Sequence, residues 1–287
     1  MASGARGVAE VIRGSVMYLQ HWKLTHSPFA PRYAVRHFFA SPTHDEALAR
    51  LQFLIDDGRR VGLLLGGSGS GKSTVLEVLR GSLSKGGTSV ALLNLQGLDE
   101  DETLWQLAAA FGLNPTSEAR RGWLWRAIAD FLVAQRYQQR TTVVLFDDAD
   151  EVTADLTPLL SRLLDWEQMP ETRLTVALAA RPEFAARLGQ RVLQLAELRV
   201  NLEPWDASDT AAYVRSMLAA AKCESAGFND DALRRLHALT GGQPRRVAQL
   251  ANLALLAGAG QALPEVDAAT VQGVFDELAF GEVMTPL

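Results

Sequence analysis

A glycine-rich run ending in a lysine and two hydroxyl residues holds the side chains of this sequence best suited to chemistry. It reads Gly66, Gly67, Ser68, Gly69, Ser70, Gly71, Lys72, Ser73 and Thr74. The spacing matches G-x-x-x-x-G-K-[ST], in which glycines let backbone N–H groups converge on one anion. Lys72 would then reach the outer phosphates of a nucleotide, and the Ser73 hydroxyl would ligate Mg²⁺. A flexible Gly/Ser linker is the alternative, but the apolar run 61–65 before it and the helical pattern after it favour a phosphate-binding loop.

An acidic pair, Asp147 and Asp148, follows the apolar run 142–146. The carboxyl end of a buried parallel strand is where ligands bind in open α/β sheets. Asp147 is therefore a candidate Mg²⁺ ligand, and Asp148 is a candidate base for an attacking water, with Glu151 as its alternative. The same cluster could instead start a loop and cap the next helix.

The composition is that of an ordinary globular protein, with 287 residues, 48% hydrophobic content and a net charge of −5. That charge gives no overall basic field to favour nucleic acid. The single cysteine, Cys223, excludes an intramolecular disulfide and fits a reducing compartment. The N-terminal residues lack the apolar core of a signal peptide, and no run has the roughly 18 apolar residues of a membrane span. We therefore expect a cytoplasmic protein.

Strand and helix patterns alternate up to Pro204. Strands are expected at 61–65, 89–95, 142–146, 173–179 and 198–202. Helices are expected from the opening at 41–43 to about 55, and at 72–83, 102–112, 118–138, 154–165 and 183–188. Thr43 and Glu46 suggest a capping box at the first of these helices. The alternation predicts an α/β fold, a parallel sheet with helices on both faces. Beyond Pro204, helices alone are expected, at 207–221, 229–239, 245–257 and 267–279.

Four further segments add to the two clusters. They are 18–29, which includes Ser27-Pro28-Phe29; 41–50, which reads Ser-Pro-Thr-His-Asp-Glu-Ala-Leu-Ala-Arg; 181–184, which reads Arg-Pro-Glu-Phe; and 241–246, which reads Gly-Gly-Gln-Pro-Arg-Arg. With them, residues 17–280 resemble the AAA+ ATPases of the general secretion pathway protein A (ExeA) and TniB-like transposition group. The resemblance implies a P-loop NTPase of AAA+ type with ATP and Mg²⁺ as cofactors, self-association and a macromolecular partner. We expect residues 1–16 to be poorly structured, 17–204 to form the nucleotide-binding domain and 205–287 to form a helical lid.

The resemblance also assigns roles by position. Gly66 to Thr74 match Walker A, Asp147 matches the Walker-B metal acid, and Arg245 matches the sensor-2 arginine, which in this family type touches the γ-phosphate from the lid. Loss of that phosphate would release the lid. A local interpretation is also open, because glycines 241–242 could end one helix and Pro244 could begin the next. Both interpretations of this segment can hold at once.

Three positions depart from the family pattern. Asp148 replaces the usual Glu and is one methylene shorter. The stretch 177–180 offers no polar sensor-1 side chain, and Arg181 stands where the family has Gln. No residue matches an arginine finger cleanly; the candidates are Arg187, Arg191 and Arg199. These departures bear on the speed of hydrolysis and on activation by a neighbouring subunit, and they leave nucleotide binding intact.

Three functions remain open. The first is a slow Mg²⁺-dependent ATPase that works as a conformational switch and remodels or recruits a partner. The second is an ATP-gated DNA-binding helper, and the third is a nucleotide-binding adaptor that hydrolyses nothing. ATP is favoured over GTP because the chain has no guanine-reading N-K-x-D segment. The tryptophans 105, 123 and 125 have few basic neighbours, which suits core packing or a partner-facing patch better than base stacking.

Overall fold

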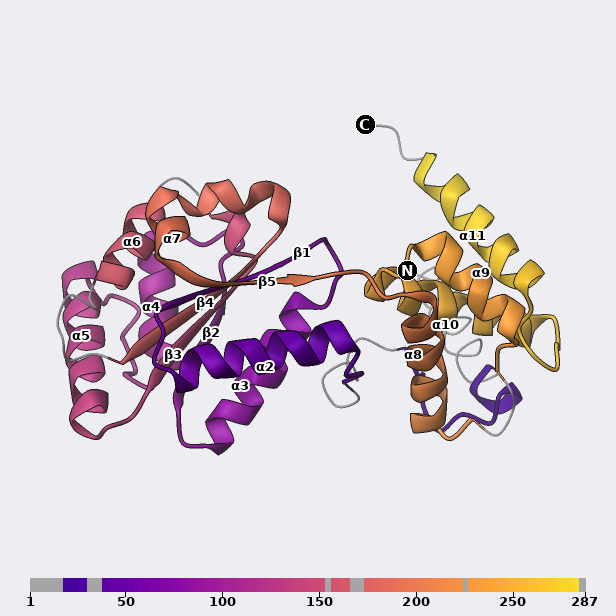
Figure 1. Ribbon diagram of the computed structural model, residues 1–287, viewed down its shortest axis with the longest axis horizontal. Helices are drawn as coiled ribbons and strands as arrows, with labels where there is room; N and C mark the ends of the chain where they lie inside the picture. Colours follow the sequence, from indigo (N-terminus) through magenta and orange to yellow (C-terminus); the bar gives the residue numbers. More distant parts are fainter. Residues whose placement is uncertain (1–17, 30–37, 153–155, 166–172, 224–226, 284–287) are drawn as a thin grey trace, which may run out of the picture. The chain divides into compact units, whose positions relative to one another are not determined.

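The computed structural model describes residues 18–29, 38–152, 156–165, 173–223 and 227–283, which fall into two compact units (Figure 1). The α/β unit runs from Pro42 to Glu203. The helical unit takes the described residues up to Ser41 and those from Pro204 onward. The expectation for residues 1–16 lies outside the described residues.

The α/β unit is built on a five-stranded parallel sheet in the order β2-β3-β4-β1-β5. Its strands are β1 (Val61–Gly66), β2 (Ser89–Asn94), β3 (Thr142–Asp147), β4 (Leu174–Ala180) and β5 (Ala196–Leu202). The predicted α/β fold is confirmed. Since all the strands are parallel, their carboxyl ends share one edge, and the phosphate-binding loop and the acidic pair both follow strands at that edge.

Helices cover both faces of this sheet (Figure 1). On β3, Val143 and Leu145 pack with the α2 and α3 side, whereas Val144 and Phe146 pack with the α4 to α7 side. A strand buried on both faces must be apolar at every position, which explains the unbroken run 142–146. The helices are α2 (Pro42–Asp56), α3 (Lys72–Lys85), α4 (Glu100–Ala110), α5 (Arg121–Tyr137), α6 (Thr157–Asp165) and α7 (Gln190–Leu195), with short 3₁₀ turns at Ala149–Glu151 and Pro182–Leu188.

α2 starts within the predicted opening at 41–43, but its first turn differs from the prediction. The helix begins at Pro42, so Thr43 lies inside its first turn, and Glu46 pairs with Arg50 at 2.6 Å. The predicted capping box is therefore wrong. Proline suits the first helical position because its missing N–H would have had no partner there.

The helical unit consists of α8 (Ala207–Ala220), α9 (Asp230–Thr240), α10 (Pro244–Gly260) and α11 (Ala268–Val283). The lead-in before Ser41 completes its core: Trp22 is 1% exposed, and its indole N–H donates to the carbonyl of Leu255 at 2.8 Å. Phe29 belongs to the same core. The sequence prediction places the lead-in in the nucleotide-binding domain from residue 17, but it groups with the helical unit instead. Four short helices gain buried apolar area from these aromatic rings.

Candidate nucleotide-binding site

The glycine-rich loop connects β1 to α3 and depends on its glycines at specific positions. Gly69 and Gly71 adopt φ angles of 77° and 99°, in the left-handed region that favours glycine. A Cβ on Gly66 would lie 2.4 Å from the hydroxyl oxygen of Ser70, so a side chain there would block closure of the loop. The Ser70 hydroxyl itself is buried and has no hydrogen-bond partner among the residues that the structure describes.

Lys72 begins α3 and folds back across this loop. Its Nζ donates to the carbonyl oxygens of Gly66 (2.7 Å) and Gly67 (3.2 Å), and the residue is 6% exposed. Burial lowers the pKa of Lys72. Nearby negative charges oppose that shift and favour the ammonium form; they belong to Asp150, Asp148 and Asp147. The structure thus places the predicted lysine and acids in one electrostatic cluster.

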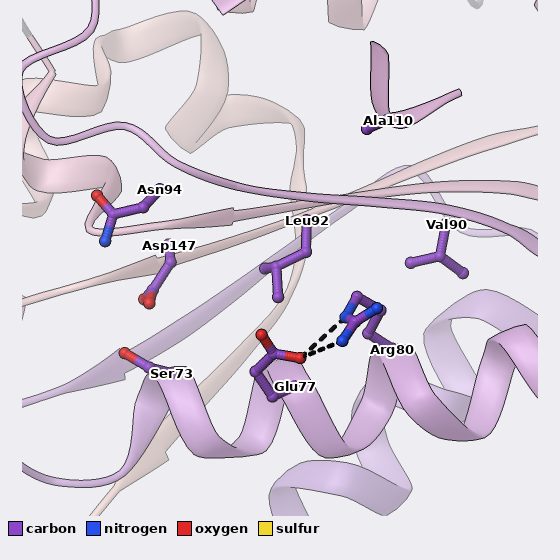
Figure 2. A pocket seen from close by; sticks show the side chains of 8 residues that line it. All are labelled: Ser73, Glu77, Arg80, Val90, Leu92, Asn94, Ala110 and Asp147. Carbon is purple, nitrogen blue, oxygen red and sulfur yellow. Dashed lines mark hydrogen bonds and ion pairs between the residues drawn. The ribbon is translucent and has the colours of Figure 1, made fainter. Parts of the chain in front are cut away.

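Ser73 and Asp147 meet at the edge of the sheet (Figure 2). The Ser73 hydroxyl lies near the Asp147 carboxylate and favours its charged form. Burial raises the pKa of Asp147 and the charge of Asp148 adds to the rise, while the nearby Ser73 hydroxyl and the hydrogen bond from the Asp148 N–H (3.0 Å) lower it. A hydroxyl and a carboxylate side by side provide the oxygen ligands that Mg²⁺ prefers, and a cation there would offset the unfavourable burial of Asp147.

Asp148 is held by a residue that the sequence analysis missed. It has a φ of 47°, and its Oδ2 accepts a hydrogen bond of 2.7 Å from Nδ2 of Asn94. Asn94 ends β2 and pairs in register with Asp147 on β3. Its position at the carboxyl end of a neighbouring strand was the available signal, because all such ends lie at the ligand-binding edge.

Arg181, which stands where the family pattern has Gln, is engaged with two acids. Its backbone N–H and Nε donate to the carboxylate of Asp150 at 3.0 and 2.5 Å, and its Nη2 pairs with Glu151. Glu151 is thus held in an ion pair, which does not suit the alternative base that the sequence suggests. The pair between Arg181 and Asp150 joins the end of β4 to the turn that follows β3.

The three arginine-finger candidates all have partners within the α/β unit. Arg187 stacks over the ring of Phe184, with its guanidinium carbon 4.4 Å from the ring centroid. Arg191 pairs with Asp165 at 2.7 Å, and Arg199 donates to the carbonyl of Leu193 at 3.2 Å. These contacts favour local structural roles over a role at a neighbouring subunit.

A hollow of about 460 Å³ opens beside Ser73 and Asp147, between α3 and β2 (Figure 2). Its floor on β2 is apolar, and the ion pair of Glu77 and Arg80 (2.8 Å) lies on the helical side. The complete lining is Ser73, Glu77, Arg80, Val90, Leu92, Asn94, Ala110 and Asp147. The hollow gives solvent access to the Ser73 hydroxyl and the Asp147 carboxylate.

Arg245 lies in the other unit, as the exposed second residue of α10. Gly241 ends α9 with a φ of 59°, and Pro244 occupies the first turn of α10. The local interpretation of this segment is therefore confirmed. Of the sequence-predicted site residues, the structure brings together the glycine-rich loop, Asp147 and Asp148.

Comparison with known proteins agrees with this geometry. Residues 55–188 match the family model described as AAA domain. This chain carries an AAA domain. It is also 33% identical over 245 residues to the general secretion pathway protein A of Aeromonas hydrophila, a match that covers 84% of this chain and 45% of that protein. The chain thus spans less than half the length of this relative. The resemblance stated from the sequence is confirmed.

Solved structures show the same AAA+ fold. The ORC1 protein of Aeropyrum pernix, in complex with DNA, superposes with a TM-score of 0.66 at 18% identity, over 91% of this chain and 72% of that one. The RuvB Holliday junction branch migration motor of Thermotoga maritima gives a TM-score of 0.58 at 14% identity, over 84% and 70%. At these identities the similarity is one of fold. Among the described helices of the present chain, none is long and apolar enough to cross a membrane.

Proposed function

We propose that the AAA domain binds Mg²⁺ and ATP and hydrolyses ATP slowly, and that the change of nucleotide state switches the conformation of the helical unit. The switch would remodel or recruit a macromolecular partner. The main support is that Ser73 and Asp147 line the same hollow, close to the buried ammonium of Lys72. Oxygen ligands and a lysine cation on one glycine-rich loop are the elements that phosphoryl transfer requires.

The residues at this site fit a magnesium nucleotide. Lys72 would exchange the carbonyl oxygens of its own loop for phosphate oxygens, to which its ammonium is attracted by full charge. Ser73 and Asp147 would hold the metal from two neighbouring segments. When bound, the nucleotide supplies the phosphoanhydride bond to be cleaved, and the metal neutralises charge on its phosphates.

Asp148 is the residue we assign as the proton acceptor for the attacking water. Its carboxylate lies next to the metal acid and is oriented by the amide of Asn94. The Asn94 amide donates a hydrogen bond to Oδ2 of Asp148, one of the two oxygens that could accept the proton. The aspartate side chain is also shorter than that of a glutamate. Both features favour slow turnover, because a general base must come within hydrogen-bond reach of its water.

Arg245 is the residue we assign as the sensor of the γ-phosphate. Its guanidinium is exposed at the start of α10 and carries a permanent positive charge. A cation that binds only the nucleotide with the extra phosphate would change the position of its helix when that phosphate leaves. Self-association of several chains is compatible with this switch and belongs to the same proposal.

A binding titration tests the proposal. Purified full chain should bind Mg·ATP saturably, and Lys72→Ala should weaken binding by about 30- to 100-fold, the value of a charge-assisted hydrogen bond. Lys85→Ala, at the exposed far end of the same helix, is the matched control and should bind like wild type. Binding that is absent in wild type, or unchanged in Lys72→Ala, would overturn the proposal.

Turnover separates the switch from an adaptor that does not hydrolyse. Phosphate release should be measurable for wild type under saturating Mg·ATP and should fall to the background rate for Asp148→Asn. Equal rates for the two proteins would favour the adaptor.

ATP-gated DNA binding is the second candidate, because the ORC1 and RuvB structures described above concern proteins that handle DNA. The tryptophan-rich segment gives it little support: Trp125 is buried, and Arg121 pairs with Glu100 and Asp101. Sedimentation with duplex DNA, with and without Mg·ATP and at two salt concentrations, tests it. ATP-dependent, salt-sensitive cosedimentation would support DNA binding, and an unchanged sedimentation profile would rule it out.

A further inference from the structure

His44 packs against the glycine-rich loop from the first turn of α2. It is 3% exposed, and its Nε2 lies 3.0 Å from the carbonyl oxygen of Ser70. A Cβ on Gly71 would lie only 2.5 Å from the same nitrogen, so the imidazole fills the space beside this glycine. The histidine comes from a helix outside the nucleotide motifs, and neither the Walker A nor the Walker B assignment includes it.

The backbone of His44 is held in place by the packing of its helix, α2. Ala47, Leu51 and Ile55 of α2 are buried in the core that this helix shares with α3 and the sheet. The side chain therefore has little freedom to follow the loop if the loop moves. Because packed interiors resist deformation, the packing of α2 against the core can hold His44 in place, and His44 can in turn restrain the loop.

The hydrogen bond has a defined direction. A carbonyl oxygen can only accept, so Nε2 of His44 carries the hydrogen and donates it. The peptide between Ser70 and Gly71 is planar and trans, so its C=O and its N–H point in opposite directions. With the C=O turned toward His44, the N–H of Gly71 is turned away from it. Within the described chain this N–H has no acceptor.

This peptide needs an external anchor. Gly71 has a φ of 99° and no side chain, so its own conformational preferences do not fix the orientation of the neighbouring peptide. A loop whose donors are fixed before binding does not lose that freedom when the ligand arrives. A loop whose peptides rotate freely loses that conformational freedom each time a ligand binds.

We propose that His44 is a positioning residue of the nucleotide site. By holding the Ser70 carbonyl, it keeps the Gly71 N–H aimed at the place where a phosphate binds. The proposal rests on the proposed function, since it assumes that the loop receives the phosphates of a nucleotide. It adds a residue from α2 to the phosphate-binding apparatus and assigns that residue one hydrogen bond.

Two substitutions of equal length isolate the hydrogen bond. His44→Gln retains an amide N–H at a reach similar to that of Nε2, whereas His44→Met fills similar space without a donor. The full chain of each variant is titrated with Mg·ADP and Mg·ATP. His44→Met should lose about tenfold in affinity for both nucleotides, the value of one ordinary hydrogen bond together with the orientation it fixes. His44→Gln should stay within about threefold of wild type.

Hydrogen exchange without nucleotide supplies a second measurement. The amides of residues 66–74 should exchange faster in His44→Met than in His44→Gln, because the peptide has lost its anchor. Tight binding by His44→Met, or equal loss in both variants, would overturn the role of His44 even when wild type binds well. A wild type that binds no nucleotide overturns the proposed function itself, and the exchange difference then decides whether His44 anchors the loop.

Discussion

The Asp150 carboxylate, which is 1% exposed, accepts hydrogen bonds from both the backbone N–H and Nε of Arg181, at 3.0 and 2.5 Å. This pair joins the turn after β3, which carries Asp148, to the end of β4. A buried carboxylate that loses its partner destabilises a protein more than the intact pair stabilises it. Arg181 is therefore a structural counter-charge in a site otherwise rich in acids.

The first prediction concerns this pair. Arg181→Met should lower the midpoint of thermal unfolding by roughly 5 °C or more, because Asp150 is left buried and unpaired. Adding Asp150→Asn should restore part of the loss by removing the orphaned charge. Circular dichroism melts measure both effects.

A control is available in the pair of Arg191 and Asp165, whose side chains are 46% and 43% exposed. Arg191→Met should shift the midpoint by about 1 °C at most, as is usual for a surface ion pair. The decrease in unfolding midpoint for the double variant Arg181→Met with Asp150→Asn is compared with the sum of the decreases for the two single variants. If the two are equal, Arg181 and Asp150 are not coupled and the interpretation is wrong.

The second prediction concerns metal dependence. Removing Mg²⁺ with a chelator should weaken the binding of ATP to wild type. Ser73→Ala should bind ATP with the same affinity with and without Mg²⁺, and that affinity should be about tenfold lower than that of wild type in the presence of Mg²⁺. The reason is that Ser73 and Asp147 would ligate the metal together. Ser82→Ala, an exposed serine on the same helix, should keep the full dependence. Calorimetric titration measures all three proteins, and a metal response retained by Ser73→Ala would contradict the assignment.

Much of the α/β unit could be predicted because its strands are buried on both faces and read as short apolar runs. The run 142–146 became β3 with a boundary one residue away, and the glycine-rich loop fell between a strand and a helix as expected. Such features depend on local sequence and on a parallel sheet with a single ligand-binding edge.

The remaining features depend on residues far apart in the chain. His44 reaches Ser70, Asn94 reaches Asp148, and the indole N–H of Trp22 reaches the carbonyl of Leu255. No periodicity in the sequence indicates which of several nearby elements such a side chain will touch. The sequence therefore places the lead-in with the α/β unit, although it groups with the helical unit. Aromatic content predicts that the rings are buried, but it does not identify the core that they join.

The third prediction concerns acid stability. Asp267 precedes α11 and accepts hydrogen bonds from the backbone N–H and the hydroxyl of Thr270, at 2.8 and 2.7 Å. These bonds lower the pKa of Asp267. The stabilisation is therefore complete above the ordinary aspartate pKa of about 3.9 and disappears as the pH falls through the lower pKa of the folded state.

At neutral pH, Asp267→Ala should reduce the free energy of unfolding by about 1 kcal/mol, the usual contribution of an N-cap. The difference from wild type should shrink below about pH 4. Asp267→Asn keeps an oxygen acceptor without a titrating group, so it should remain close to wild type at neutral pH. Urea denaturation at pH 7 and pH 3 measures this, and a difference for Asp267→Ala that does not depend on pH would contradict the role of the carboxylate.

The fourth prediction compares two adjacent glycines, Gly241 and Gly242, which both have positive φ angles, of 59° and 70°. A Cβ on Gly242 would lie 1.9 Å from the carbonyl oxygen of Trp205, whereas nothing lies within 4 Å of a Cβ on Gly241. The Trp205 N–H also donates to the carbonyl of Gly242 at 3.0 Å, and its indole N–H donates to the Ser41 hydroxyl at 3.0 Å. The turn before α10, which carries Arg245, is thereby attached to the segment that follows β5.

Gly241→Ala should cost about 1 kcal/mol, because only the left-handed backbone conformation is strained. Gly242→Ala should cost about 3 kcal/mol or more, because the methyl group must also displace the backbone of Trp205. Urea denaturation followed by circular dichroism compares the two variants. Equal losses would mean that backbone conformation alone explains both glycines, and that the attachment of Trp205 to this turn contributes nothing measurable to stability.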